Sequence, residues 1–259
     1  MAFSSYGHRL GVRVNEKDAL PRVLDCLPPG WKPVANPEVD CLYSVVVGTS
    51  GPRVRRFSLL YLGAQRIART HDVDELFETL ESNLKLHVAE MARSRLFVHA
   101  GVVGFRGRAI VLPGPSHAGK STLVSALVDA GATYYSDEYA VFDDKGRVHP
   151  YARPLALRAD SGRPDRKVAI VRAGKRPLPV GLVALTRYKR GARWRARSLS
   201  PGEALLALLE NTLPVRRRPE AALLTLRRVV TGASVVKGIR GDAEDAVQRL
   251  LKEVQDGRS

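Results

Sequence analysis

The stretch from 72 to 93 carries apolar side chains at intervals of three and four residues: Leu76, Phe77, Leu80, Leu84, Val88 and Met91. This spacing places them on one face of an amphipathic helix. Asp72 and Asp74 stand at its start, where carboxylates can cap free amides and complement the helix dipole. We therefore predict a helix that ends near Arg93.

Three shorter runs before this helix are rich in β-branched and aromatic residues, which favours strands. They are Leu42–Gly48, Arg56–Ala64 and the shorter Gln65–Thr70. We expect residues 1–94 to form a small α+β N-terminal domain, or an extension packed on the rest of the chain.

Two further apolar runs, Leu96–Gly104 and Arg108–Leu112, are separated only by Phe105-Arg106-Gly107. A parallel crossover needs about a dozen residues, so this short link predicts an antiparallel hairpin. The sheet of residues 95–259 should therefore be mixed, unlike the all-parallel sheet of common nucleotide-switch proteins. The predicted fold class is α/β with a mixed, partly antiparallel sheet.

The C-terminal third alternates strand and helix patterns. Val180–Arg187 is predicted to be a strand, with Ala192–Ser198 as its partner, and Ala233–Ile239 another strand. Ser200, Pro201 and Glu203 match a capping box that begins a helix running to Glu210. Asp242 is predicted to cap a last helix whose inward face holds Ala243, Ala246, Val247, Leu250 and Leu251.

Residues 159–179 are rich in Gly, Pro, Arg and Lys and are broken only by the apolar Val168–Val171. A basic segment of this kind is suited to a lid or a substrate clamp. A disordered surface loop is the alternative that the composition leaves open.

The composition is that of a globular chain with a strong basic bias. In 259 residues, 44% are hydrophobic and 26% charged, which allows one large domain or two modest ones. Cys26 and Cys41 are too few for a disulfide framework or a zinc site, so we expect reduced thiols. No apolar run reaches signal-peptide or membrane-spanning length, so we expect a cytoplasmic protein without a membrane partner.

The formal charge of +16 is unevenly distributed. Residues 153–240 hold 21 Lys and Arg against 5 Asp and Glu, whereas residues 1–152 hold 18 against 16. Such a field favours an acidic partner, although a solvated arginine-rich surface would have the same composition. Aromatic residues make up only 6% of the chain, so a nucleic-acid-binding platform is not expected.

The residues Gly114, Pro115, Ser116, His117, Ala118, Gly119, Lys120 and Ser121 match the pattern G-x-x-x-x-G-K-[ST], and Thr122 follows. In this motif the backbone amides cradle phosphates, the lysine contacts the β- and γ-phosphates, and the serine hydroxyl can bind Mg²⁺. The apolar strand before it and a helix after it, with its apolar face at Leu123, Ala126, Leu127 and Ala130, provide the required context. We predict a nucleoside triphosphate site, with ATP and Mg²⁺ as ligands and His117 at a permissive position.

Asp137 and Glu138 follow the next apolar strand, only 17 positions after Lys120. Adjacent carboxylates suit Mg²⁺ binding, proton abstraction from a hydroxyl, or both, although a polar turn has the same pattern. His99 lies amid apolar strand residues, where a histidine is more often packed than catalytic.

The order of His99-Ala100, the phosphate loop, Asp137-Glu138 and Pro154–Arg158 resembles the catalytic domain of HPr kinase/phosphorylase. The resemblance covers about residues 95–160. It implies a fold related to phosphoenolpyruvate carboxykinase and phosphorylation of a serine of a carrier protein. The family has His-Gly at His99-Ala100, Asp-Asp at Asp137-Glu138, and a glutamate where this chain has Ala156.

Specific roles follow from that resemblance. Asp137 would be the acid/base that acts on the substrate hydroxyl, and Glu138 would help to hold the metal. His99 would lie beside the transferring phosphate, and Arg158 would stabilise its charge. Without the glutamate, metal binding would lose one carboxylate at Ala156, and the reverse phosphorylase reaction is not implied.

These observations predict an ATP-dependent kinase acting on a hydroxyl of an acidic protein, a peptide or a small molecule, with a homo-oligomeric state. Two alternatives stay open. One is a regulatory protein that binds nucleotide without transferring phosphate, and the other is a nucleic-acid-associated ATPase motivated only by the basic stretch.

Overall fold

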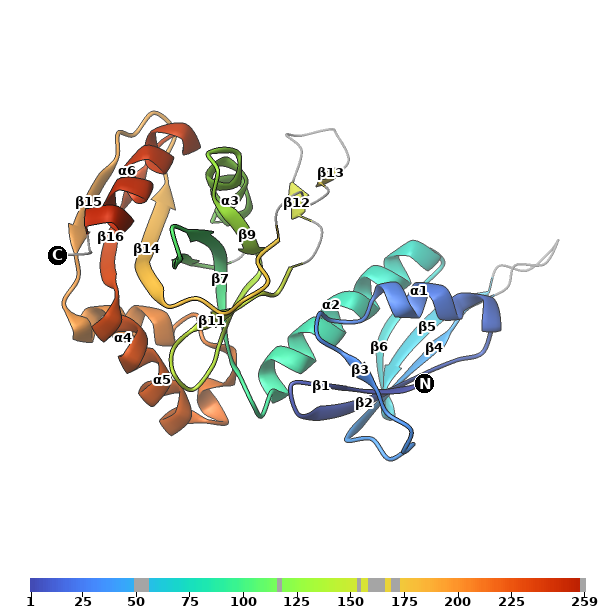
Figure 1. Cartoon of the computed structure of the whole chain (residues 1–259). Coiled ribbons are helices and arrows are strands. Elements are labelled where there is room, and N and C mark those ends of the chain that lie inside the picture. Colours follow the sequence, from blue (N-terminus) through green and yellow to red (C-terminus); the bar gives the residue numbers. More distant parts are fainter. Residues whose placement is uncertain (49–55, 116–117, 153–154, 158–165, 169–172, 257–259) are drawn as a thin grey trace. The chain divides into compact units, whose positions relative to one another are not determined.

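The chain divides at Ser94 into two units, Met1–Ser94 and Arg95–Ser259 (Figure 1). The computed structural model describes residues 1–48, 56–115, 118–152, 155–157, 166–168 and 173–256. Within these ranges, no helix combines the length and the apolar character needed to cross a membrane.

The first unit is built on a six-stranded sheet of order β3-β1-β2-β4-β5-β6. Only β2 and β4 run parallel, and every other neighbouring pair is antiparallel. The strands are β1 (Ala2–Ser5), β2 (His8–Val14), β3 (Lys32–Pro33), β4 (Cys41–Val46), β5 (Ser58–Leu62) and β6 (Gln65–Thr70). The three predicted strands are thereby confirmed with small shifts at their ends, while β1, β2 and β3 were not predicted.

One face of this sheet is covered by helices α1 (Leu20–Asp25), which follows the short η1 (Lys17–Ala19), and α2 (Val73–Met91). The prediction for α2 is confirmed, since Asp72 Oδ1 accepts hydrogen bonds from the amides of Asp74 at 2.8 Å and Glu75 at 3.4 Å. Its apolar stripe is buried against side chains from β1, β2, β4 and β5.

The second unit contains an eight-stranded mixed sheet of order β11-β10-β7-β8-β14-β16-β15, with β9 pairing with β7. The strands are β7 (Leu96–Phe105), β8 (Arg108–Pro113), β9 (Thr133–Ser136), β10 (Tyr139–Phe142), β11 (Val148–His149), β14 (Val180–Tyr188), β15 (Arg195–Ser198) and β16 (Ser234–Arg240). Parallel pairing joins β8 to β14 and β14 to β16, and the other pairs are antiparallel.

Strands β7 and β8 form the predicted antiparallel hairpin. Phe105 pairs with Arg108, so the turn has only two residues, Arg106 at φ 48° and Gly107 at φ 79°. Two consecutive positive φ angles match the twist of the flanking strands, and Gly107 adopts its angle without the steric penalty that Arg106 carries. The mixed sheet predicted from this short link is confirmed.

Helices cover both faces of this sheet (Figure 1). On one face, α4 (Pro201–Leu209) and α5 (Pro219–Gly232) pack on Ala109 and Val111 of β8; α5 follows η2 (Leu213–Arg216). On the other face, α3 (Lys120–Asp129) and α6 (Ala243–Asp256) pack on Ile110 and Leu112. This alternation shows why β8 is apolar from Ala109 to Leu112, since a strand buried on both faces needs no polar side.

Several sequence predictions in this unit are wrong. Arg195–Ser198 pairs with β16 and not with the strand Val180–Tyr188, which lies between β8 and β16. In the predicted loop 159–179, Arg166–Val168 is strand β13, which pairs with β12 (Leu155–Leu157), while 159–165 and 169–172 lie outside the described residues. Ala130 is exposed, and Val124 takes a buried place in α3 instead.

Helix α5 was not predicted, although Ala222, Leu226, Val229 and Val230 repeat at helical spacing. The capping box at Ser200 is confirmed: Glu203 N donates to its Oγ at 3.3 Å, and Ser200 N donates to Glu203 Oε2 at 3.0 Å. The inward face of α6 is confirmed at Ala246, Val247, Leu250 and Leu251.

Candidate functional site

The site predicted from the sequence lies at one edge of the second sheet. Because β8 and β9 are both antiparallel to β7, they run in the same direction, and β14 and β16 are parallel to β8. The chain therefore leaves β8 at Pro113, β9 at Ser136 and β16 at Arg240 along the same edge. Ligands of open α/β sheets bind outside these carboxyl ends.

The loop after β8 leads directly into α3. Gly119 is the N-cap residue of α3 with φ 77°, and its carbonyl oxygen accepts the Leu123 amide at 3.2 Å. The loop begins at Gly114, whose amide donates to the His99 carbonyl oxygen at 3.2 Å. The amides of the first turn of a helix have no partner within the helix, so this end of α3 is suited to bind an anion.

Lys120 folds over this loop. Its Nζ donates to the carbonyl oxygens of Gly114 at 2.8 Å and Pro115 at 2.6 Å. Burial lowers the pKa of Lys120, while the nearby carboxylates of Asp137 and Glu138 act in the opposite direction without cancelling the effect. The ammonium group thus lies where a phosphate could replace weak carbonyl partners.

Asp137 is oriented by two hydrogen bonds. The Ser121 hydroxyl donates to its Oδ2 at 3.1 Å, and the Tyr134 hydroxyl donates to its Oδ1 at 2.8 Å. Burial, reinforced by the Asp137 charge, raises the pKa of Tyr134, so this phenol stays a hydrogen-bond donor. Adjacent ligands of octahedral Mg²⁺ lie about 3 Å apart, and the spacing of Ser121 Oγ and Asp137 Oδ2 fits a shared ion.

The turn that carries Asp137 and Glu138 is held by Ser136. Its hydroxyl oxygen accepts the amides of Glu138 at 3.1 Å and Tyr139 at 3.0 Å. The Glu138 carbonyl oxygen accepts the Ala100 amide at 3.1 Å, which ties the turn to β7 beside the loop. The two acids therefore lie between strands β9 and β10, on the edge where the loop begins.

His99 joins this group through its backbone and its ring. Its amide donates to the Asn211 carbonyl oxygen at 2.7 Å, and its ring centroid lies 5.3 Å from that of Tyr139. The side chain is half-buried. It is therefore a half-buried residue packed beside Tyr139, and its role next to a transferring phosphate stays a prediction.

The remaining predicted residues divide into two groups. Ala118 lies in the loop, where its amide donates to the Pro115 carbonyl oxygen at 3.3 Å, and Thr122 is exposed in the first turn of α3. Ser116, His117 and Arg158 lie outside the described residues.

Two residues of the site were missed by sequence reasoning. Tyr134 orients Asp137, and its spacing of three residues from the acid was the available signal. Arg240 ends β16, is only 3% exposed and donates from Nη2 to the Gly119 carbonyl oxygen at 2.9 Å. Nothing local in the sequence marks Arg240, because 121 positions separate it from Gly119.

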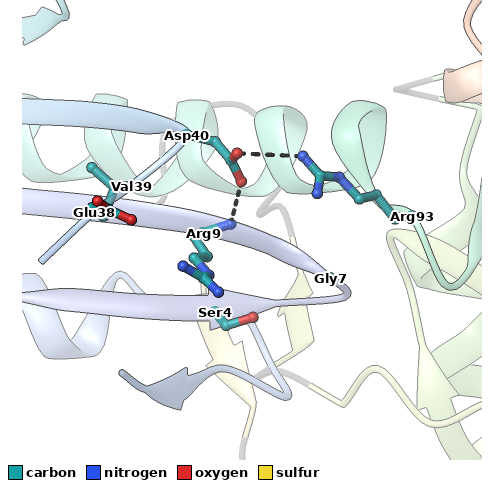
Figure 2. A pocket seen from close by; sticks show the side chains of 7 residues that line it. All are labelled: Ser4, Gly7, Arg9, Glu38, Val39, Asp40 and Arg93. Atoms are coloured by element: carbon teal, nitrogen blue, oxygen red, sulfur yellow. Dashed lines mark hydrogen bonds and ion pairs between the residues drawn. The ribbon is translucent and has the colours of Figure 1, made fainter. Parts of the chain in front are cut away.

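A separate polar pocket of about 460 Å³ lies within the first unit (Figure 2). It is lined by Ser4, Gly7, Arg9, Glu38, Val39, Asp40 and Arg93. Asp40 accepts the Arg9 amide at 2.9 Å and pairs with Arg93 Nη2 at 3.3 Å, as the dashed lines show. These contacts already use the carboxylate, and the pocket has none of the predicted phosphate-binding residues.

Among the described residues, no three His, Cys, Asp or Glu side chains gather as a metal cluster, and Cys26 and Cys41 are free thiols. A Mg²⁺ ion at Ser121, Asp137 and Glu138 would therefore take its remaining ligands from phosphate and water. That arrangement is the usual one for this ion in phosphoryl-transfer sites.

The fold and the site define a mixed α/β protein with a phosphate-loop sequence at the carboxyl edge of its sheet. No protein-family model matches the chain, and a search of curated proteins finds no match. Among solved structures, the Hpr(Ser) kinase/phosphatase from Coxiella burnetii is similar at 14% identity with a TM-score of 0.33. The match covers 62% of this chain and 95% of that chain.

Proposed function

We propose that this protein is an ATP- and Mg²⁺-dependent kinase that transfers the γ-phosphoryl group to a hydroxyl, such as a serine of a protein or peptide. The observation that carries the proposal is the hydrogen bond of 3.1 Å between Ser121 and Asp137. It brings the hydroxyl of the phosphate-loop motif together with an acid from the next strand. A candidate metal ligand and a candidate base would therefore lie beside the predicted phosphates.

The proposed chemistry depends on positioning and on charge neutralisation. The loop amides and Lys120 would hold the β- and γ-phosphates, with Ser121, Asp137 and Glu138 as the metal-binding residues. Bound there, Mg²⁺ would neutralise charge on the phosphate oxygens. Asp137 would orient the acceptor hydroxyl and accept its proton, while His99 would lie beside the transferred group and Arg158 would stabilise its charge.

The distribution of charge supports an acidic acceptor. Residues 153–240 carry 21 basic against 5 acidic residues, and the exposed strand β15 contributes Arg195 and Arg197. Such a surface would accelerate the approach of an acidic protein, peptide or small molecule. The acceptor hydroxyl would then reach Asp137 at the carboxyl edge of the sheet.

A second candidate is a regulatory protein that binds nucleotide and transfers nothing. Ala156 favours it, since the family that the sequence resembles has a glutamate there. A metal site with one carboxylate fewer could still hold the nucleotide while turning over poorly.

Phosphotransfer from γ-labelled ATP in cell extract separates the two candidates. The kinase proposal expects a labelled protein, peptide or small molecule that depends on both Mg²⁺ and the wild-type protein. Asp137→Asn serves as the inactive control. Saturable ATP binding without any labelled acceptor would contradict the kinase proposal and favour the regulatory protein.

A further inference from the structure

Arg240 is a buried cation at the predicted phosphate site that the proposed chemistry does not use. Its guanidinium donates from Nη2 to the Gly119 carbonyl oxygen at 2.9 Å and from Nη1 to the Gly241 carbonyl oxygen at 3.1 Å. Only 3% of the residue is exposed. Both partners are neutral carbonyls, so the positive charge of Arg240 is not compensated by either of them.

Among the described residues no carboxylate touches this charge, and Asp242, two positions along the chain, acts on it only through space. No carboxylate forms an ion pair with Arg240, and its buried Nε has no hydrogen-bond acceptor. Tyr188 places its ring centroid 5.3 Å from the guanidinium, a cation–π contact that leaves the charge in place. Buried cations are otherwise found paired, because removing an unpaired charge from water is costly.

The position of Arg240 indicates which ligand would supply that counter-charge. Nη2 lies only 2.6 Å from where a Cβ at Gly119 would be, so the guanidinium is pressed against the N-cap of α3. Lys120 is the first residue of α3, directly after Gly119, so its ammonium belongs to the same helix end. A phosphate bound at that helix end would therefore interact with the helix dipole and Lys120, with the Arg240 guanidinium next to the same N-cap residue.

We infer that Arg240 is a second phosphate-binding cation of this site and that a phosphate group of the bound ligand is its counter-ion. The inference rests on the proposed nucleotide site and deepens it. Arginine suits this role because its planar guanidinium can hold the loop carbonyl and a phosphate oxygen at once. The ligand class is any polyphosphate, with or without a nucleoside.

Calorimetry with inorganic tripolyphosphate tests this inference without depending on the base or on turnover. Arg240→Gln should weaken binding by about 10- to 100-fold, which is typical for loss of one charge-assisted hydrogen bond. Arg240→Lys should restore part of the affinity, because the charge returns without the planar fork. Arg249→Gln, which removes the same charge from an exposed position of α6, should bind within about twofold of wild type.

A second measurement, made on the wild-type protein, does not depend on whether the variants fold. In ¹⁵N-arginine-labelled protein, the Arg240 Nε–H resonance, assigned by its absence in Arg240→Lys, should move when tripolyphosphate is added. If the Arg240 resonance does not move, the residue is purely structural and the inference is overturned. Equal tripolyphosphate binding by Arg240→Gln and wild type would also overturn the inference, while the nucleotide proposal would stand. If wild type binds neither MgATP nor tripolyphosphate, the nucleotide proposal fails together with it.

Discussion

Ser121 donates a hydrogen bond to Asp137 at 3.1 Å and thereby links the first turn of α3 to the turn after β9. The other carboxylate oxygen is held by Tyr134 at 2.8 Å. With both oxygens oriented, Asp137 has little freedom to rotate. A change at this residue should therefore affect chemistry more than architecture.

Asp137→Asn should reduce phosphotransfer by about 10²–10⁴-fold, the usual contribution of a general base. The amide keeps the size of the side chain but cannot accept a proton from the acceptor hydroxyl. Nucleotide binding should be largely retained, because Lys120 and the loop amides are unchanged. Single-turnover transfer measures this, with Asp129→Asn at the exposed end of α3 as control; wild-type turnover in Asp137→Asn would contradict the assignment.

Glu138→Gln should raise the Mg²⁺ concentration needed for half-maximal rate by several-fold, because the site loses a carboxylate near the metal. The maximal rate at saturating Mg²⁺ should fall much less. A Mg²⁺ titration of the initial rate distinguishes the two effects. An unchanged titration midpoint would remove Glu138 from the metal-binding residues.

Lys120→Ala should abolish measurable binding of MgATP while the protein remains folded. Within the described part of the chain, the Lys120 ammonium donates hydrogen bonds to loop carbonyls, at 2.6 and 2.8 Å, and it has no part in the apolar core. Calorimetry measures the affinity, and circular dichroism with thermal melting reports the fold. Unchanged affinity in a folded variant would rule out this loop as the nucleotide site.

Nucleotide affinity should decline at alkaline pH, starting below the ordinary lysine pKa of 10.5. Burial lowers the pKa of Lys120, so its charge is lost as pH rises through that lowered value. Bound phosphate favours the charged form, so binding should be accompanied by proton uptake in this range. Calorimetry above about pH 8, where phosphate is fully ionised, measures both effects.

Lys120→Arg is the matched control for this pH effect, because arginine keeps its charge throughout the range. Its affinity for MgATP, even if weaker at pH 8, should stay level as pH rises. A parallel decline in both proteins would assign the effect to another group.

Asp143 should contribute about 1–3 kcal/mol to stability at neutral pH, through a buried hydrogen-bonded carboxylate. Burial raises the pKa of Asp143, but the Arg147 amide at 2.8 Å and the His149 and Arg147 side chains outweigh it and lower the pKa below 3.8. The contribution is therefore full above the unfolded pKa and is lost as pH falls through the lower folded value.

Denaturant unfolding of Asp143→Asn against wild type from pH 7 to pH 3 tests this, with the exposed neighbour Asp144→Asn as control. The difference in the free energy of unfolding should shrink below about pH 4. A difference that stays constant with pH would show that ionisation of Asp143 is not its source.

The sequence by itself determined the features that depend on neighbours in the chain. The helix Val73–Met91, the capping box at Ser200 and the β7–β8 hairpin all follow from spacing within a few residues. The phosphate-loop motif and the acids that follow the next strand are similarly local. In each case the residues that decide the structure are close along the chain.

Only the tertiary structure decided which distant segments meet. Arg195–Ser198 pairs with β16 instead of the preceding strand β14, because both sides of β14 are already occupied by parallel neighbours. That order of strands also brings Arg240 to Gly119, 121 positions earlier in the chain. The spacing of apolar residues along the chain indicates which face of a helix or strand is buried. Which strand pairs with which across the sheet depends instead on how whole elements pack.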